Sequence, residues 1–538
     1  MYLSSSPNLK EGGVFAFAKT KEQMKLIARL LALLMACLML ATVVVACDQS
    51  STQNGGTTGG GNSGLKDDNY DVNGRLKDDL PDTLNYQGEE VTILHWSNPE
   101  NPEFEQAEIT GDNVRDAIYD RNMTVEDRLN VDLVFVGIPG HGGDRATFIK
   151  HVDSVYSANT QDYDLVSVYA RTSGTLAVQG YYLNLSTIEN SYMDLEKPWW
   201  PQQLVETVSF GNGDYYFCSG DMSTNVLYMM HMMYINKDMF SQLQIDVPYQ
   251  AVRDGQWTID KLIEVTSEVY RDLDNDNTTS KFDRYGFGAV HWVLDSFFAG
   301  SNLRYVDESD ADLLVLSPDF TSKKAVKLVN KLGQWAITDS VWVYNSAITN
   351  DSVELQGDHM KVFDEGRMLV IMQHSQYAGK HLLNADFEYG LLPVPKYEEK
   401  QVNYYTGMGN PWSLYAIFRG FDDRGEKQET LTMLSAVLEC WASEGYRLTT
   451  PEIFEVNMQL KYSAGQDETD MFEYIRSGIT FDIGKIFAAD LNNICELPSY
   501  AISANASWSY SFKSYQKAIV TNLEKIVENF RTYHSIQK

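Results

Sequence analysis

Short apolar runs that alternate with a helical pattern are the feature of this chain that most constrains its fold. Residues 90–96, 131–136 and 164–169 are rich in β-branched, aliphatic and aromatic side chains, which favour strands. The segment 112–129 has the spacing of an amphipathic helix and begins with Asp112, a good helix-capping residue. Strands that alternate with helices form parallel sheets, because parallel neighbours need a crossover connection. The sequence therefore predicts an α/β fold.

The second half of the chain continues this alternation. Residues 226–237 predict a strand, and residues 238–243 predict a short helix. Thr258 is a credible N-cap residue for another helix, because its hydroxyl can accept a hydrogen bond from a backbone N–H of the first turn. Residues 285–289 and 368–372 predict two further strands. The chain is long enough for two or three domains' worth of core.

A hydrophobic segment near the N-terminus has the pattern of an export signal. Residues 30–46 form an uncharged run that is apolar except for Thr42 and that follows two basic residues. We therefore predict a signal peptide over residues 1–46. The polar character of residues 1–23 favours Met24 as the true start of translation. A signal anchor that is never cleaved is the alternative interpretation.

The end of this apolar run, Val44-Val45-Ala46-Cys47, resembles the lipobox of bacterial lipoproteins. The resemblance implies cleavage before Cys47, acylation of that cysteine, and anchoring by lipid at the extracellular face of the cytoplasmic membrane. Residues 51–64 are mostly Gly, Thr, Ser and Asn, a composition that cannot form a core. We expect a flexible tether over residues 47–87, in which Lys77-Asp78-Asp79 is a solvated charge cluster.

The strong acidity of the chain argues against two classes of partner. The formal net charge is −31 over 538 residues. Nucleic acid and anionic lipid headgroups are disfavoured, because their phosphates would be repelled. We therefore expect contact with the membrane only through the lipid anchor, and a monomer.

Few residues suggest a metal cluster, a disulfide framework or catalysis. After Cys47 only Cys218, Cys440 and Cys495 remain, and a single bridge among them stays open. The sequence contains no Gly-x-Ser-x-Gly, no His-Glu-x-x-His and no phosphate-cradling glycine loop after a strand. We therefore predict that the chain is not an enzyme and requires no cofactor.

Several motifs together carry a family resemblance. The hallmark stretch comprises residues 234–240, Pro248 and residues 255–262. It resembles extracellular solute-binding proteins, family 1, which are the sugar-binding lipoproteins of ABC importers. The resemblance extends from about residue 80 to the C-terminus. Further matches to the longer members found in Gram-positive bacteria are residues 111–122, 198–200, 363–368, 389–397 and 460–462.

The resemblance implies a two-lobed periplasmic-binding-protein-like fold of type II, with the lobes joined by a hinge that the chain crosses more than once. By analogy the crossings fall near residues 220–224 and 404–409. The implied boundaries are 88–222 plus 406–450 for lobe one and 223–405 plus 451–538 for lobe two.

The same resemblance implies a function. The expected role is capture of a carbohydrate, in particular an oligosaccharide, between the lobes and its delivery to the transmembrane subunits of an ABC permease. Small peptides and other polar solutes stay open as ligands. An importer-free sensory or adhesive surface lipoprotein, or an extracellular hydrolase, stays open as the function.

Candidate ligand-binding residues follow from the chemistry of sugars. A sugar needs an aromatic plate for its C–H face and planar polar groups at the rim, and ligands of α/β sheets sit at the carboxyl ends of strands. We expect a loop over residues 170–174, and Trp412 is placed to stack from the hinge side. A lid over the core is the alternative for Trp96, and Trp199-Trp200 are interpreted as packing residues. The candidates are Trp96, Asn98, Tyr169 and Arg171 in lobe one, His291, Trp292, Asp295, Gln373, His374 and Tyr377 in lobe two, and Trp412.

One loop has the donor spacing of a calcium site. Asn277 replaces the usual turn glycine, and Asp283 replaces the final glutamate of such loops. The prediction is a structural Ca²⁺, and the alternative is a solvated Asp/Asn turn. The oxygen donors would be the side chains of Asp272, Asp274, Asp276, Ser280 and Asp283, with the carbonyl of Thr278.

Overall fold

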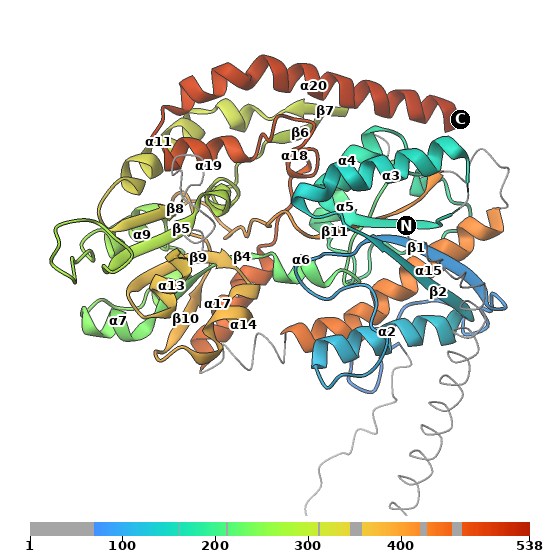
Figure 1. Cartoon of the computed structure of the whole chain (residues 1–538), viewed down its shortest axis with the longest axis horizontal. Coiled ribbons are helices and arrows are strands. Elements are labelled where there is room, and N and C mark those ends of the chain that lie inside the picture. The colour runs from blue at the N-terminus through green and yellow to red at the C-terminus, as the bar shows by residue number, and fades with distance from the viewer. Residues whose placement is uncertain are drawn as a thin grey trace, which may run out of the picture. The chain divides into compact units, whose positions relative to one another are not determined.

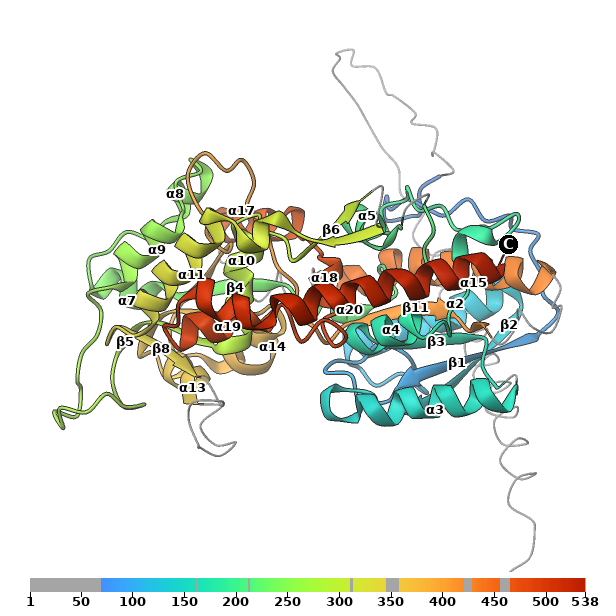
Figure 2. The same cartoon turned by 90° about the horizontal axis from the view of Figure 1, so that it is seen from above.

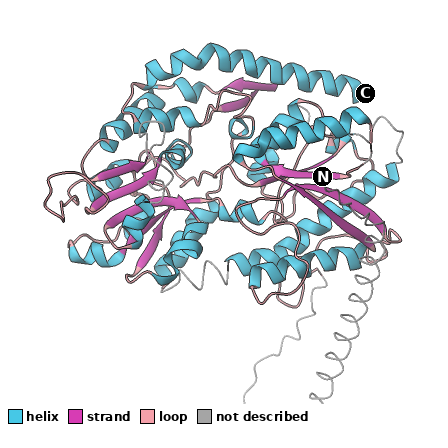
Figure 3. Ribbon diagram, in the orientation of Figure 1, coloured by secondary structure: helices cyan, strands magenta, loops and turns pink. Residues whose placement is uncertain are grey.

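Two open β-sheets with helices packed against them form the framework of the protein (Figures 1 and 3). Residues Asp68–Lys538 form one compact unit. The predicted signal peptide, Cys47, most of the tether and the motif at 460–462 lie outside the described residues. The computed structural model describes residues 69–160, 162–210, 213–309, 313–344, 358–419, 428–454 and 465–537.

The first sheet has the strand order β11-β3-β1-β2. Strands β1 (Glu89–Trp96), β2 (Val131–Ile138) and β3 (Leu165–Tyr169) run parallel, and β11 (Ser413–Ile417) is antiparallel to β3. Helix α2 (Asn113–Leu129) connects the first two strands. The Asp112 side chain caps it by accepting a hydrogen bond from the Arg115 backbone N–H at 2.9 Å. The predicted strands and capped helix are confirmed.

Further helices belong to this lobe, which we call lobe one. Helix α3 (Arg145–Ala158) connects β2 to β3, and helix α4 (Ala170–Val178) begins directly after β3. The predicted loop over residues 170–174 is therefore wrong, because these residues form the first turns of α4. Helix α15 (Gln428–Glu444) packs against α2.

The second sheet, in lobe two, has the order β10-β4-β9-β5-β8. Its strands are β4 (His231–Asn236), β5 (Tyr285–Val290), β8 (Val341–Tyr344), β9 (Met368–His374) and β10 (Tyr389–Leu392). Strands β9, β5 and β8 run parallel, whereas β4 is antiparallel to β9 and β10.

The strand predicted over residues 226–237 begins only at His231. Residues Thr224–Tyr228 form helix α6, which leads from lobe one into β4. The Thr258 hydroxyl caps helix α9 (Ile259–Thr266) as predicted, by accepting a hydrogen bond from the Lys261 backbone N–H. The remaining elements are α5 (Gln202–Val208), α7 (Lys237–Gln242), α8 (Tyr249–Arg253), α10 (Ser296–Gly300), β6 (Val306–Ser309), β7 (Leu313–Leu316), α11 (Lys323–Ala336), α13 (Asp358–Asp364), α14 (Gln376–His381), α17 (Gln466–Ser477), α18 (Ile483–Ile486), α19 (Glu496–Ser503) and α20 (Trp508–Gln537).

The chain passes between the two sheets more than once. It leaves the first sheet before α6, returns between β10 and β11, and then runs through a C-terminal segment that contacts both lobes. The architecture is therefore the predicted two-lobed α/β fold. The lobe boundaries to the residue stay a prediction. Of the helices described, none combines the length and the apolar character that crossing a membrane requires.

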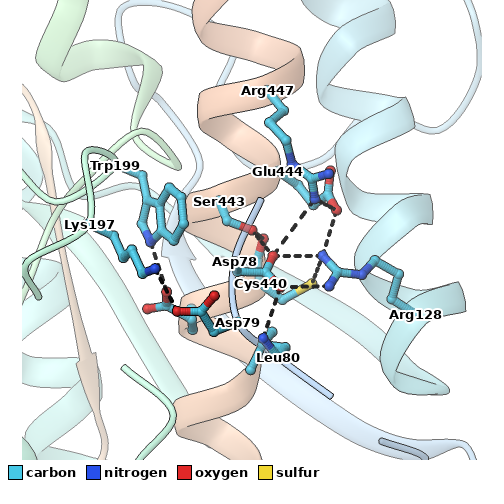
Figure 4. Close-up of polar contacts among 11 residues, drawn as sticks. Asp78, Asp79, Leu80, Arg128, Lys197, Trp199, Cys440, Ser443, Glu444 and Arg447 are labelled. Carbon is cyan, nitrogen blue, oxygen red and sulfur yellow. Dashed lines mark hydrogen bonds and ion pairs between the residues drawn. The ribbon is translucent and has the colours of Figure 1, made fainter. Parts of the chain in front are cut away.

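The segment that precedes β1 belongs to the folded unit, which begins at Asp68 and not near residue 88. Figure 4 shows that Asp78 lies in a buried ion cluster between α2 and α15. The Arg128 guanidinium donates two hydrogen bonds of 2.7 Å to Asp78 and one of 2.8 Å to Glu444. Ser443 also donates to Asp78. The interpretation of Asp78 as a solvated tether residue is therefore wrong.

The buried Glu439 of α15 also binds the side chains of two neighbouring tryptophans. The indole N–H groups of Trp199 and Trp200 donate to the Glu439 carboxylate at 3.0 and 2.9 Å. Both rings are fully buried, so their interpretation as packing residues is confirmed. Cys218, Cys440 and Cys495 are buried free thiols.

Candidate functional site between the lobes

Three stacked rings mark the carboxyl edge of the first sheet. Trp96 at the end of β1, Tyr169 at the end of β3 and His141 in the loop after β2 have ring centroids 5.7–5.8 Å apart. The Trp96 indole N–H donates to the Ser413 hydroxyl at 2.8 Å, and this side chain is fully buried. The His141 side chain is 38% exposed. The surface ring of the stack is therefore His141, and Trp96 lies in the core beneath it.

Asn98 fixes the loop that carries His141. Its side-chain oxygen accepts hydrogen bonds from the backbone N–H groups of Gly140 at 2.9 Å and His141 at 3.1 Å. Its amide donates to Asp144 at 3.0 Å. An exposed asparagine at a strand end thus positions the aromatic plate of lobe one.

Glu100 connects this edge to lobe two. Its carboxylate accepts a hydrogen bond of 2.5 Å from the Gln376 side chain of α14 and lies 3.4 Å from His141 Nε2. Its backbone carbonyl accepts a bond of 3.1 Å from Lys380. Burial raises the pKa of Glu100, but the bonds from His141 and Gln376 and the nearby positive charges outweigh it and lower the pKa to about 2. Glu100 is therefore ionised at neutral pH.

Two histidines face each other at the edge of the second sheet. His231 and His374 are cross-strand partners of β4 and β9, with ring centroids 4.8 Å apart. Both are buried, and burial lowers the pKa of His374 to about 4 and that of His231 well below its usual value. Ser296 is bonded to Nδ1 of His231. The Nε2 atoms of both rings lack a hydrogen-bond partner among the described residues.

The hinge return covers this histidine pair. The His231 backbone N–H donates to the Gly407 carbonyl at 3.0 Å, and Gly409 donates to the Met229 carbonyl at 2.7 Å. A Cβ at Gly409 would lie 2.5 Å from Nε2 of His374. Glycine is therefore needed at position 409 for the hinge to approach the ring this closely.

Two predicted charged residues have partners from the C-terminal segment. Arg171 donates to Glu496 at 2.7 Å and to the Cys495 sulfur at 3.1 Å. Asp295 is bonded to Lys485, which also donates to the Met408 carbonyl at 2.5 Å. Burial raises the pKa of Asp295, although Lys485 opposes the shift. Both charges are thus compensated within the protein.

The remaining candidates divide between the interlobe surface and the interior of lobe two. His291 stacks on Tyr500 at 5.0 Å and meets the edge of Trp292 at 5.1 Å. The Trp412 carbonyl accepts a hydrogen bond from the Ala170 backbone N–H at 2.8 Å. Two others bond inside lobe two: Gln373 donates to His359 at 3.1 Å, and Tyr377 donates to Asp364. Ligand contact by any of these residues stays a prediction.

Two small cavities lie beside this surface. Each has a volume of about 20 Å³ and is lined by Met408, Phe481, Asp482 and Lys485, among others. Such a volume holds about one water molecule. A larger cavity of about 720 Å³ lies between β7 and α20 and is lined by none of the predicted residues. We place the candidate site at the interlobe surface, because polar groups from both lobes converge there.

Sequence reasoning missed several residues of this surface. His141 and Glu100 follow strands β2 and β1, so the rule used for Trp96 could have found them. His231 stands at the start of a strand and gave no such signal. Lys485 and Glu496 come from the C-terminal segment, far along the chain from the residues they contact.

The structure brings part of the predicted calcium loop together. Carboxylate oxygens of Asp272, Asp274 and Asp276 lie within 4.8 Å of one another. Asn275 and Asn277 adopt φ angles of 60° and 58°, in the left-handed region that asparagine tolerates, so Asn277 can take the place of the usual turn glycine. These three aspartates fit the first three ligand positions.

Asp283 has a different arrangement from the one predicted. It is buried and accepts hydrogen bonds from the Leu273 backbone N–H at 3.2 Å, the Ser280 backbone N–H at 2.9 Å and the Tyr270 hydroxyl at 3.2 Å. Its carboxylate therefore holds the base of the loop together. Calcium binding by this loop stays a prediction.

Comparison with known proteins identifies the class of fold. No protein-family model and no curated protein sequence matches the chain. An ABC substrate-binding protein from Listeria monocytogenes in complex with cycloalternan matches with a TM-score of 0.51 at 12% identity, over 81% of this chain and 99% of that one. The cyclic α-maltosyl-1,6-maltose binding protein from Arthrobacter globiformis gives the same values.

A third match binds a different ligand. UgpB from Mycobacterium tuberculosis, in complex with glycerophosphocholine, has a TM-score of 0.50 at 13% identity, over 81% of this chain and 98% of that one. At these identities the likeness concerns the fold. The protein has the two-lobed fold of the solute-binding proteins of ABC transporters.

Proposed function

We propose that the protein is an extracellular substrate-binding lipoprotein of an ABC importer, which captures a carbohydrate between its lobes and delivers it to the permease. The observation that carries the proposal is the interlobe surface. There the edges of both sheets bring together the His141 ring, Glu100, Gln376 and Lys380 on the fold of a solute-binding protein. A flat ring with hydrogen-bonding groups at its rim is what a sugar requires.

The charges of this surface favour an uncharged ligand. Arg171 is paired with Glu496, Asp295 with Lys485, and Glu100 lies beside Lys380 and His141. A phosphodiester or a peptide with free termini would need an unpaired counter-charge, because burial of an uncompensated charge is costly. A saccharide needs only hydrogen bonds. We therefore favour an oligosaccharide, the kind of ligand that one matching structure contains and that another matching protein is named for binding.

The export and lipid anchoring in this proposal rest on the sequence of residues 30–47. Replacing Cys47 with Ser would remove the acylated atom. We expect the unaltered chain to be shorter by residues 1–46 and to carry the lipid, and the C47S chain to keep residues 1–46. An unaltered chain that keeps residues 1–46 would instead support the uncleaved signal anchor.

The experiment that tests ligand capture is a thermal-shift screen of the folded unit, residues 68–538, with oligosaccharides and with glycerophosphocholine. A ligand that binds only the native state raises the unfolding midpoint. At a ligand concentration of 100 times Kd, the free energy of unfolding rises by about 2.7 kcal/mol. We expect a shift with one class of saccharide and recovery of the saccharide unchanged. A shift with glycerophosphocholine alone would refute the carbohydrate assignment, and cleaved saccharide would show a hydrolase.

A matched pair of histidine variants tests the site. We expect His141→Ala to weaken saccharide binding by about two- to tenfold, since an aromatic contact is worth about 0.5–1.5 kcal/mol. The control is His151→Ala on the same lobe, where the ring contacts Tyr163. Equal saccharide Kd values for the two variants would show that His141 does not contact the ligand.

A further inference from the structure

The C-terminal segment lies against both lobes. Figures 1 and 2 show α20 running along lobe two and lobe one in turn. The helix has 30 residues, which corresponds to a length of about 45 Å. A continuous helix of this length transmits displacement from one end to the other, so its two contacts cannot move independently.

The N-terminal end of α20 is fixed to lobe two. The Trp508 indole N–H donates to the Phe320 carbonyl at 3.0 Å, and its backbone N–H donates to the Asn330 side chain at 3.1 Å. Phe512 packs on Phe320 with ring centroids 5.1 Å apart. Both aromatic residues of the helix are buried.

The C-terminal end of α20 is fixed to lobe one. Asn529 donates to the Val178 carbonyl at the end of α4, at 3.1 Å. Phe530 is buried against Phe210 at 4.8 Å and Tyr216 at 5.1 Å. The segment of these two aromatic residues belongs to lobe one, because the adjoining Cys218 pairs with β11.

Two polar contacts between α4 of lobe one and the C-terminal segment add to this attachment. Arg171 of α4 is paired with Glu496 of α19 at 2.7 Å, and Thr175 of α4 donates to Asp490 at 2.8 Å. Helix α19 itself packs on α11 of lobe two. Opening the lobes would therefore separate α4 from partners that stay with lobe two, or pull Phe530 out of its pocket.

We propose that α20 is a strap that holds the two lobes close together in the ligand-free protein and limits how far they open. The inference rests on the proposed function, since lobe closure matters for a receptor that captures a solute. Because apparent Kd equals the intrinsic Kd divided by the fraction of competent molecules, a strap that raises the closed fraction also strengthens ligand binding.

The test measures lobe separation without ligand. Cysteines introduced at the exposed positions Lys150 of lobe one and Gln250 of lobe two can carry a donor and an acceptor dye, because the described native cysteines are buried. Transfer efficiency is then compared among the unmodified strap, Phe530→Ala and Asn529→Ala. The matched control is Tyr510→Ala, which removes a side chain of the same helix that is 79% exposed.

We expect Phe530→Ala and Asn529→Ala to lower the transfer efficiency of the ligand-free protein, and Tyr510→Ala to leave it unchanged. Unchanged or higher efficiency in both strap variants would overturn the proposal. If Phe530→Ala fails to fold, the transfer efficiency of Asn529→Ala tests the strap, because the Asn529→Ala variant keeps the aromatic packing of Phe530. The saccharide Kd should rise about two- to tenfold in parallel. If no saccharide binds, the proposed function is refuted. The strap is then still tested, because the lobe separation is measured without ligand.

Discussion

Replacement of Asp78 with Ala should destabilise the folded unit far more than replacement of its neighbour Asp79. The Asp78 side chain is fully buried, and it receives both guanidinium nitrogens of Arg128 together with the Ser443 hydroxyl. Asp79 forms a single ion pair of 2.6 Å with Lys197, and its side chain is 72% exposed. The two residues are adjacent in sequence, so the comparison isolates the effect of burial.

The expected magnitude follows from the partners that remain. Without Asp78, Arg128 and Arg447 would share only the Glu444 carboxylate, which leaves positive charge uncompensated in a buried place. Removing one partner of a buried ion pair costs about 3–5 kcal/mol, whereas an exposed pair contributes less than about 1 kcal/mol. For a unit of about 470 residues, 1 kcal/mol corresponds to roughly 1 °C, so Asp78→Ala should lower Tm by about 3–5 °C.

The assay is thermal and urea unfolding of both variants, followed by circular dichroism at pH 7. Burial raises the pKa of Asp78, but the hydrogen bonds and charge of Arg128, with Ser443 and Arg447, hold it below its usual value of 3.8. A lowered pKa means that the contribution is present above about pH 4 and is lost as pH falls below it. The difference between the variants should therefore shrink in strong acid. Equal stability of the two variants at pH 7 would refute the argument from burial.

Two other predictions concern protonation and metal. Burial lowers the pKa of His374 to about 4, so the unfolded chain takes up a proton near pH 6.5 that the folded protein does not. The contribution of His374 alone should lower stability by about 1.6 kcal/mol between pH 6.5 and pH 5. His374→Asn should flatten this slope in urea unfolding, and an unchanged slope would count against the assignment. We also propose that Ca²⁺ raises Tm through the loop at Asp272, Asp274 and Asp276. Asp274→Asn should abolish that shift, and a calcium-independent Tm in the unaltered protein would support a solvated turn.

The elements that sequence predicted well are those whose signal is local. Strands β1, β2 and β3 were predicted from their own apolar residues, and α2 from its spacing and its Asp112 cap. Residues 226–228 were assigned to a strand because a short apolar run looks the same in a buried helix and in a buried strand. Only the tertiary structure shows that they belong to α6.

The features that sequence missed depend on partners far away in the chain. Asp78 was interpreted as a solvated charge because its partner Arg128 lies 50 residues away, and Glu444 lies 316 residues beyond Arg128. Arg171 was predicted as a site residue from its place after β3, but its partner Glu496 is 325 residues away. The ends of predicted strands indicate where a site lies. The ion pairs that neutralise its charged residues involve partners far along the chain, which a local sequence pattern does not show.

The attachment of the N-terminal segment has a mechanical consequence. Because Asp78 is clamped between α2 and α15, a pull on residue 69 is transmitted into lobe one through several ionic contacts at once. Lobe two carries none of that load at this junction. Lobe one is therefore the anchored part of the molecule, and lobe two moves relative to it within the range that the proposed α20 strap allows.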